Sequence, residues 1–384
     1  MKSYLSYLFI IFLLTPCYSN PSLKESLYDD IEDGALDSFS PIEAAFIISG
    51  VNNSDSLEIN LNWYQALIQD IQNKRMIDIF DKPASAEKVF LYLHTTWLIT
   101  YKKEATTLLD IKQHKEFNCV SATILYNLTC DELGLSTMAF ETPTHVYTIF
   151  ANFTQDIMVE NTTSIGFNII KNLDRYSRYM ARYYPEKQIY KIGLHRLYAY
   201  ENSQGRRITN VELLGLISYN QAYLTTKQKN YQQAYEYVLL AQSFNQDSRS
   251  NRKFEINLYY KWGNQLYDQK DFCQGFEVFA DANYRYPDNK DFENNCIIFF
   301  FKALHKLWLA KNWETTGEIV NEIAELKILS DDDLDSLAEK LVKWGYYFYQ
   351  TKQKKNGLHA IELLKEIDSD AKKVRELERI INFL

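Results

Sequence analysis

The sequence predicts an α+β domain in the amino-terminal half and an all-α array of helical repeats in the carboxyl-terminal half. Residues 117–162 read first with helical spacing and then as three short runs rich in β-branched and aromatic residues. From about residue 205 the pattern is helical to the end, with tripeptides that recur 41 residues apart at 229, 270 and 311. The length of 384 residues agrees with two domains or with one domain and a repeat array.

The first residues have the composition of a signal peptide. Lys2 is followed by an apolar run over residues 4–14, and the small residues Cys17 and Ser19 stand two positions apart after it. Such a run is too short to cross a bilayer, which needs about 20 residues, but it suits export. We expect cleavage after Ser19, with lipid attachment at Cys17 as the alternative. Residues 1–19 are therefore predicted to be a signal peptide, and the mature protein to be periplasmic or secreted.

Composition and charge limit the classes of partner. Lys and Arg number 42 against 50 Asp and Glu, a net charge of −8 that argues against nucleic acid. The longest later apolar run, residues 296–301, is too short for a membrane span. The cysteines after the leader are too dispersed for a disulfide scaffold, although a bridge between Cys273 and Cys296 stays open.

The chain carries four Asn-x-Ser/Thr sequons. Asn127 falls on the predicted helix of Cys119 and Asn161 lies next to Glu160, where a glycan would obstruct packing or the candidate site, so we expect a bacterial source in which the sequons are unused. The sequons lie at Asn52, Asn127, Asn152 and Asn161.

The approach to the central stretch is predicted to be an acidic linker and then helices. Residues 20–40 are polar and acidic, and suit a linker or a solvated first helix. From Pro41 to Tyr101 apolar residues recur at helical spacing. His94 lies within that aromatic helical face, so we expect a packed residue, and His114 is expected in an exposed loop.

Cys119 is predicted to lie in the first turn of a helix. Asn118 can cap the start of that helix, and Gly134 stands where a left-handed residue would end it. The partial positive charge of a helix N-terminus favours thiolate over thiol, which is what a nucleophilic cysteine needs.

Three antiparallel strands are predicted after this helix, and they bring His145 and Glu160 together. If residues 152–155 form the turn between the last two strands, residue 147 lies opposite residue 160. His145 and Glu160 are then diagonal neighbours on one face, roughly 7 Å apart at the backbone. Asp156 lies beside the turn, too far along the strand. The arrangement predicts Cys119 as nucleophile, His145 as base and Glu160 as the acid that orients it.

Alternatives remain beside this triad. A cysteine on an amphipathic helix is most often a small buried hydrophobe, and Cys130 is expected to be one. A metal site of Cys119, His145 and Glu160 is conceivable, but no close ligand pair such as CxxC or HxxxH supports it. We expect no cofactor and no metal.

The stretch resembles the transglutaminase-like superfamily, a papain-related group that orders its residues as Cys on a helix, His on a strand and an acid on the next strand. The segments that carry the resemblance are NCVSATILY around Cys119, LGL at 133–135, TPTHVY around His145 and VENT around Glu160. The resemblance covers residues 85–165. It implies a papain-like fold over residues 41–190 and acyl-transfer chemistry with these residues as nucleophile, base and acid, although the family's acid is usually Asp.

The carboxyl-terminal half, residues 205–384, shows an internal repeat. Lys229-Asn230-Tyr231, Lys270-Asp271-Phe272 and Lys311-Asn312-Trp313 each lie between two amphipathic helical segments, and the same is expected in the fourth unit. The last tripeptide, Lys355-Asn356-Gly357, follows the third by 44 residues. A small residue follows the aromatic by three positions, at Ala234, Gly275 and Thr316, with Ala360 in the last unit. These offsets resemble the tetratricopeptide repeat, which implies a concave surface for a peptide or protein partner. The alternative is an array that only buttresses the first domain.

Two functions follow as expectations. The first is an exported cysteine hydrolase of the peptidase or amidase type, acting by acyl transfer through Cys119, His145 and Glu160 on a peptide or protein substrate. The second is a non-catalytic scaffold that binds a protein partner through the repeats.

Overall fold

The computed structural model describes residues 22–152, 155–367 and 371–383. The predicted signal peptide and Cys17 lie outside these residues. The chain divides between Phe254 and Glu255 into two compact units, which are described here one at a time.

Helices make up 70% of the chain, and the fold class is predominantly all-α. Among the described residues, strands form only a two-stranded and a four-stranded sheet, and no strand exceeds five residues. The prediction of an α+β, papain-like domain is therefore wrong, and with it the resemblance to the transglutaminase-like superfamily. The strand pattern in residues 117–162 is real, but it is confined to short elements within a predominantly helical chain.

Four capped helices open the amino-terminal unit. They are α1 (Leu23–Asp30), α2 (Pro41–Ile48), α3 (Ser54–Asn73) and α4 (Lys82–Thr96). The side chains of Ser22, Ser40, Asn53 and Asp81 accept a backbone N–H of the first turn, which satisfies a donor that a helix start leaves unpaired. Residues 22–40, which the sequence assigns to a linker, contain α1, and Leu27 and Ile31 are buried in the main core.

Helix α6 (Cys119–Glu132) lies at the centre of this core. Its residues from Val120 to Cys130 are all buried, so the helix has no solvent face over most of its length. It follows α5 (Leu108–His114) and a short parallel pair, β1 (Thr100–Tyr101) with β2 (Glu116–Phe117). Gly134 follows the end of α6 and has a left-handed conformation with φ 74°, as the helix-stop pattern predicts.

The four-stranded sheet has the order β5-β4-β3-β6 and is antiparallel throughout. Its strands are β3 (Thr137–Glu141), β4 (Val146–Phe150), β5 (Ile157–Val159) and β6 (Arg206–Ile208). Thr148 pairs with Val159 and Phe150 with Ile157, which is the register that the sequence predicted between the last two strands. The expectation of helix from residue 205 onward is wrong at its start, because β6 adds an edge strand beside β3.

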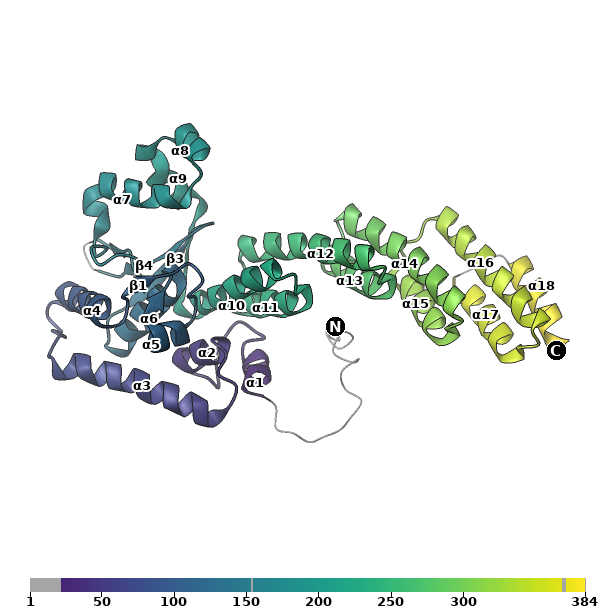
Figure 1. The fold of residues 1–384 in the computed structure, drawn as a ribbon, viewed down its shortest axis with the longest axis horizontal. Coiled ribbons are helices and arrows are strands. Elements are labelled where there is room, and N and C mark those ends of the chain that lie inside the picture. The colour runs from purple at the N-terminus through teal and green to yellow at the C-terminus, as the bar shows by residue number, and fades with distance from the viewer. Residues whose placement is uncertain (1–21, 153–154, 368–370, 384) are drawn as a thin grey trace. The chain divides into compact units, whose positions relative to one another are not determined.

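The two faces of this sheet are covered by different helices (Figure 1). On one face, Val146 and Phe150 join the main core with α6. On the other, Tyr147 and Met158 pack in a second, smaller core with residues of the segment 169–204. That segment holds α7 (Leu173–Met180), α8 (Glu186–Ile192) and α9 (Leu197–Gln204) with short 3-10 turns between them.

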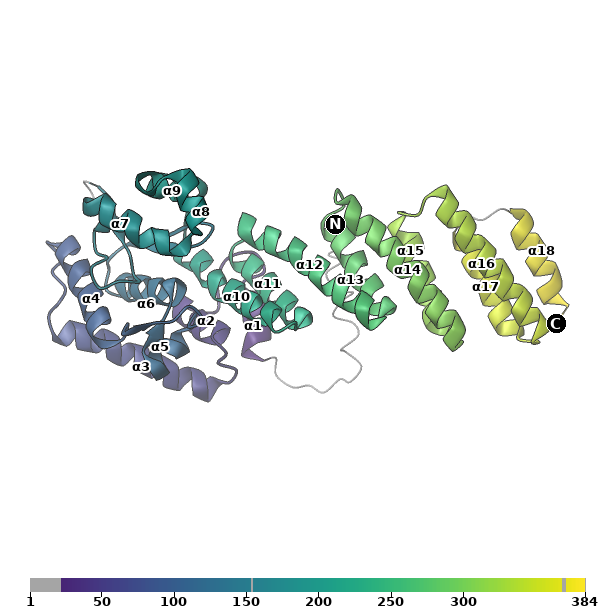
Figure 2. The same cartoon turned by 45° about the horizontal axis from the view of Figure 1, so that its top comes forward.

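The rest of the chain consists of antiparallel helix pairs at a constant period. The helices are α10 (Asn210–Lys227), α11 (Tyr231–Phe244), α12 (Arg249–Gln269), α13 (Phe272–Arg285), α14 (Lys290–Ala310), α15 (Trp313–Leu326), α16 (Asp331–Gln350), α17 (Lys354–Glu366) and α18 (Ala371–Asn382). Helix α10 packs on α2 and α6 and belongs to the amino-terminal unit, while α12 runs across the division between the units. Both views show α14 with α15 and α16 with α17 side by side (Figures 1 and 2).

A left-handed lysine ends the first helix of each pair. Lys229, Lys270, Lys311 and Lys352 have φ between 56° and 61°. The fourth unit therefore keeps the spacing of the others and turns at Lys352, which corrects the prediction that Lys355-Asn356-Gly357, 44 residues after the third tripeptide, lies at its turn. Gly357, rather than Ala360, then occupies the position of Ala234, Gly275 and Thr316. A Cβ on Gly357 would meet Ile381, and one on Gly275 would meet the ring of Phe299, so both positions need a small residue.

Within the described residues, the structure has no helix that is both long enough and apolar enough to span a membrane.

Candidate functional site

Cys119 is the first residue of α6, and a side-chain network holds the helix start. The Asn118 side-chain oxygen accepts the N–H groups of Val120 at 2.9 Å and Ser121 at 3.1 Å. In return, the Ser121 hydroxyl accepts the N–H of Asn118 at 3.0 Å. Cys119 is partly exposed, whereas the residues that follow it in α6 are buried. The thiol therefore lies at the one end of α6 where N–H groups face outward and solvent has access.

His145 and Glu160 form a buried pair. The His145 Nε2 atom lies 2.7 Å from the Glu160 Oε2 atom, and both side chains are fully inaccessible to solvent. The two residues lie just beyond the ends of β4 and β5, where the observed register makes them the diagonal neighbours that the sequence predicted. Cys119 lies near enough to the imidazole of His145 to raise its pKa. The structure thus brings all three predicted site residues together.

The surroundings of His145 favour its protonated form. Burial alone would lower the pKa of His145, but the charge of Glu160 and hydrogen bonds with Cys119 and Glu160 outweigh it, and the pKa lies well above its usual range. Thr142 fixes the backbone beside the ring: its hydroxyl accepts the His145 N–H at 3.0 Å, and its own N–H donates to the His145 carbonyl at 2.8 Å. The imidazole is therefore held in both position and charge.

Glu160 has further partners that sequence reasoning did not find. Its Oε1 atom accepts the backbone N–H of Thr162 at 3.1 Å and also the Thr162 hydroxyl. That hydroxyl contacts the phenol of Tyr179 in α7. Gly166 closes the loop: its carbonyl accepts the Glu160 N–H at 3.0 Å. The sequence pattern does not predict that Tyr179 contacts Thr162, because the two residues belong to separate elements.

The competing carboxylate is bound elsewhere. Asp156 Oδ2 lies 2.7 Å from a guanidinium nitrogen of Arg207. This agrees with its exclusion as partner of His145.

A buried polar cluster lies behind the site, between α6 and the sheet. The Asn161 amide donates to the Thr148 hydroxyl at 2.7 Å and to the Thr123 hydroxyl at 3.2 Å, and the Thr148 hydroxyl in turn donates to the Asn127 oxygen at 2.5 Å. Asn127 and Asn161 are fully buried. In this fold neither sequon can carry a glycan.

The remaining histidines and cysteines are not part of the group of Cys119, His145 and Glu160. His94 is 9% exposed, with its ring 4.5 Å from that of Phe90, and burial lowers its pKa to about 4, so it is packed as expected. His114 is exposed. Burial raises the pKa of Cys130 well above its usual range, which agrees with a structural role. Cys273 and Cys296 are free thiols, so the bridge left open between them is not formed. Among the described residues, no three His, Cys, Asp or Glu side chains are grouped to hold a metal ion.

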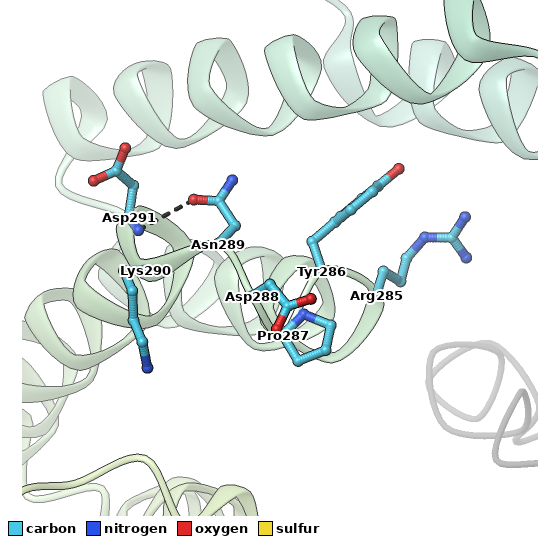
Figure 3. A pocket seen from close by; sticks show the side chains of 7 residues that line it. All are labelled: Arg285, Tyr286, Pro287, Asp288, Asn289, Lys290 and Asp291. Atoms are coloured by element: carbon cyan, nitrogen blue, oxygen red, sulfur yellow. Dashed lines mark hydrogen bonds between the residues drawn. The ribbon is translucent and has the colours of Figure 1, made fainter.

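Two hollows lie away from this site. One, of about 580 Å³, is lined by the turn between α13 and α14 (Figure 3). Its Arg285 pairs with buried Glu255 at 2.6 Å, and it holds no nucleophile. A second, of about 600 Å³, is lined by acidic and serine side chains of residues 26–38. Neither offers the chemistry that the sequence predicts.

Comparisons with known proteins leave the family open. No family model matches the chain, and no curated protein matches it. Among solved structures, the chain is similar to the crystal structure of menin, described as revealing the binding site for Mixed Lineage Leukemia (MLL) protein. The similarity covers 94% of both chains at 10% sequence identity, with a TM-score of 0.37. At these values the similarity carries no argument about function.

Proposed function

We propose that this protein is an exported cysteine hydrolase that cleaves peptide or amide bonds through Cys119, His145 and Glu160. The observation that supports it most is the buried His145–Glu160 pair at 2.7 Å beside a partly exposed cysteine on a helix N-terminus. Export rests on the leader sequence alone.

Each of the three residues has a role in this chemistry. Because Nε2 of His145 contacts Glu160, we assign to Nδ1 the role of taking the proton of the Cys119 thiol. The thiolate attacks the amide carbonyl carbon, and a C–S bond forms. His145 returns the proton to the leaving amine as the C–N bond breaks. Water then attacks the thioester, His145 removes its proton, and the acid and the thiol are released.

The helix start supplies a candidate oxyanion donor. The Asn118 cap binds the N–H groups of Val120 and Ser121, which leaves the N–H of Cys119 for the oxygen of the tetrahedral intermediate. Glu160 stabilises the imidazolium that forms when His145 takes the proton, and Thr162 keeps that carboxylate in place.

The test is the rate at which iodoacetamide alkylates Cys119 between about pH 5 and 9, followed by peptide mass spectrometry. An ordinary thiol is protonated below about pH 8.5 and reacts slowly there. We expect fast alkylation of Cys119 at about pH 6. In His145→Ala the rate should be at least tenfold lower, because the thiolate loses its charge-assisted interaction with the imidazolium. His114→Ala is the matched control, because that histidine is exposed and outside the site.

The second candidate is a non-catalytic scaffold that binds a protein through the helix pairs. It is favoured if Cys119 reacts only after unfolding, or if its rate is the same in His145→Ala and the parent protein.

A further inference from the structure

A second buried carboxylate lies beside the site, on α9. Glu201 is 1% exposed. Its Oε1 atom accepts the Thr144 hydroxyl at 2.8 Å, but its Oε2 atom has no hydrogen-bond partner. Among the residues that the structure describes, no Lys, Arg or His lies within ion-pair distance of it.

Two observations place this carboxylate next to the candidate site. Thr144, its partner, directly precedes His145 in the chain and is exposed. Tyr147 and Tyr176 lie close to both acids: burial raises the pKa of each phenol, and the charges of Glu160 and Glu201 raise it further. Glu201 and Glu160 therefore share one neighbourhood.

The energetics of burial indicate a missing partner. A buried carboxylate is costly unless a cation and hydrogen bonds compensate it, and buried polar atoms are almost always paired. Glu160 has His145 as its cation and Thr162 as donor. Among the described residues, Glu201 has one hydroxyl donor and no cation. A positively charged group from outside the protein would supply what it lacks.

We propose that Glu201 recognises a Lys or Arg side chain of the substrate, which reaches it past the exposed Thr144. This rests on the proposed function and names its substrate class. The net charge of −8 agrees with it, since an acidic protein attracts cationic peptides.

The experiment uses two affinity probes, Nα-acetyl-lysine chloromethyl ketone and Nα-acetyl-norleucine chloromethyl ketone. They differ only in the side-chain ammonium group, which the norleucine probe lacks. In each, the Cys119 thiolate attacks the chloromethyl carbon, so that a C–S bond forms and chloride leaves. The rate of labelling at Cys119 is measured by peptide mass spectrometry. We expect the lysine probe to react at least tenfold faster than the norleucine probe, as a charge-assisted contact requires.

Glu201→Gln should reduce this ratio to about one and leave the norleucine rate within about twofold, since Gln keeps the shape and loses the charge. Glu186→Gln, an exposed acid on α8, is the matched control and should keep the ratio. Equal rates for the two probes in the unmodified protein overturn the proposal without any variant, provided that Cys119 is labelled. If neither probe nor iodoacetamide labels Cys119 in the folded protein, the proposed function fails and this inference fails with it.

Discussion

At the scale of single residues, the site depends on which groups keep a charge when buried. His145 and Glu160 are fully buried yet paired at 2.7 Å, and each has additional hydrogen bonds. For His94, in the same unit, burial outweighs the charge of Glu160 and the backbone hydrogen bonds of Asn161 and Leu98, and it lowers the pKa to about 4. The pKa of His145 is thus raised and the pKa of His94 is lowered, and each shift has a measurable consequence.

Glu160→Gln should reverse the titration of His145. Without the charge of Glu160, burial dominates, so the pKa of His145 should fall below its usual value. The raised pKa in the parent protein means that the pair contributes stability that is fully present below about pH 6.5 and is lost as pH rises through the folded-state value. Ring ¹⁵N NMR follows the titration, and urea unfolding at several pH values follows the stability.

The control for this variant is Asp156→Asn, which removes a solvent-accessible carboxylate paired with Arg207. Such surface pairs contribute about 0–1 kcal/mol, so the His145 titration should not change. A His145 ring that stays protonated to the same pH in Glu160→Gln would show that another group holds its charge.

His94 should make the protein less stable in acid. Its folded-state pKa of about 4 lies below the usual value, so the unfolded chain binds a proton that the folded protein refuses. Stability is therefore lost as pH falls from about 6.5 to 4, by up to roughly 3 kcal/mol for this shift. His94→Gln should flatten this part of the unfolding curve in urea. The exposed His114→Gln should not, and equal slopes for both variants would contradict the prediction.

At the scale of elements, local signals were predictable and long-range pairings were not. The start of α6 at Cys119 follows from Asn118 and helical spacing, and the β4–β5 register follows from a short turn. The pairing of β6 with β3 joins residues more than 60 apart in the chain, and nothing in three residues reveals it. The contact of Tyr179 with Thr162 is hidden for the same reason.

The fold class was misjudged because one well-patterned stretch was extended to a whole domain. The strands of that stretch are at most five residues long, and helices occupy most of the chain on both sides. Lys355-Asn356-Gly357 matches the other tripeptides in composition, but it lies three residues after the turn of the fourth unit. The units share a lysine with a left-handed backbone at this turn, and in the fourth unit that lysine is Lys352.

Gly275→Ala tests how the helix pairs pack. Alanine in a helix is favoured over glycine by about 1 kcal/mol, but a Cβ here would overlap the buried ring of Phe299. Overpacking costs about 1–3 kcal/mol, so we expect net destabilisation in urea unfolding. Phe299→Leu in the same chain should relieve the overlap, and the double variant should lose less than the two single changes added together. Strict additivity would mean that the ring does not limit the approach.

At the scale of the whole molecule, the candidate site belongs to one unit. Cys119, His145, Glu160 and Glu201 all lie before the division at Phe254, while most of the helix pairs lie after it. The resulting expectation is that local damage to the second unit leaves the chemistry of the first unchanged. Two glycines, one in each unit, allow the same substitution to be compared.

Gly166→Ala and Gly275→Ala should therefore differ in their effect on Cys119. A Cβ on Gly166 would overlap the carbonyl group of Glu160, and the loop must shift with the acid that it carries. We expect the iodoacetamide rate at Cys119, at about pH 6, to fall about tenfold or more in Gly166→Ala, since a displaced carboxylate loses a charge-assisted hydrogen bond. In Gly275→Ala the rate should stay within about twofold, although that variant is less stable by about 1–3 kcal/mol. An equal loss of rate in both would show that the two units act on the site together.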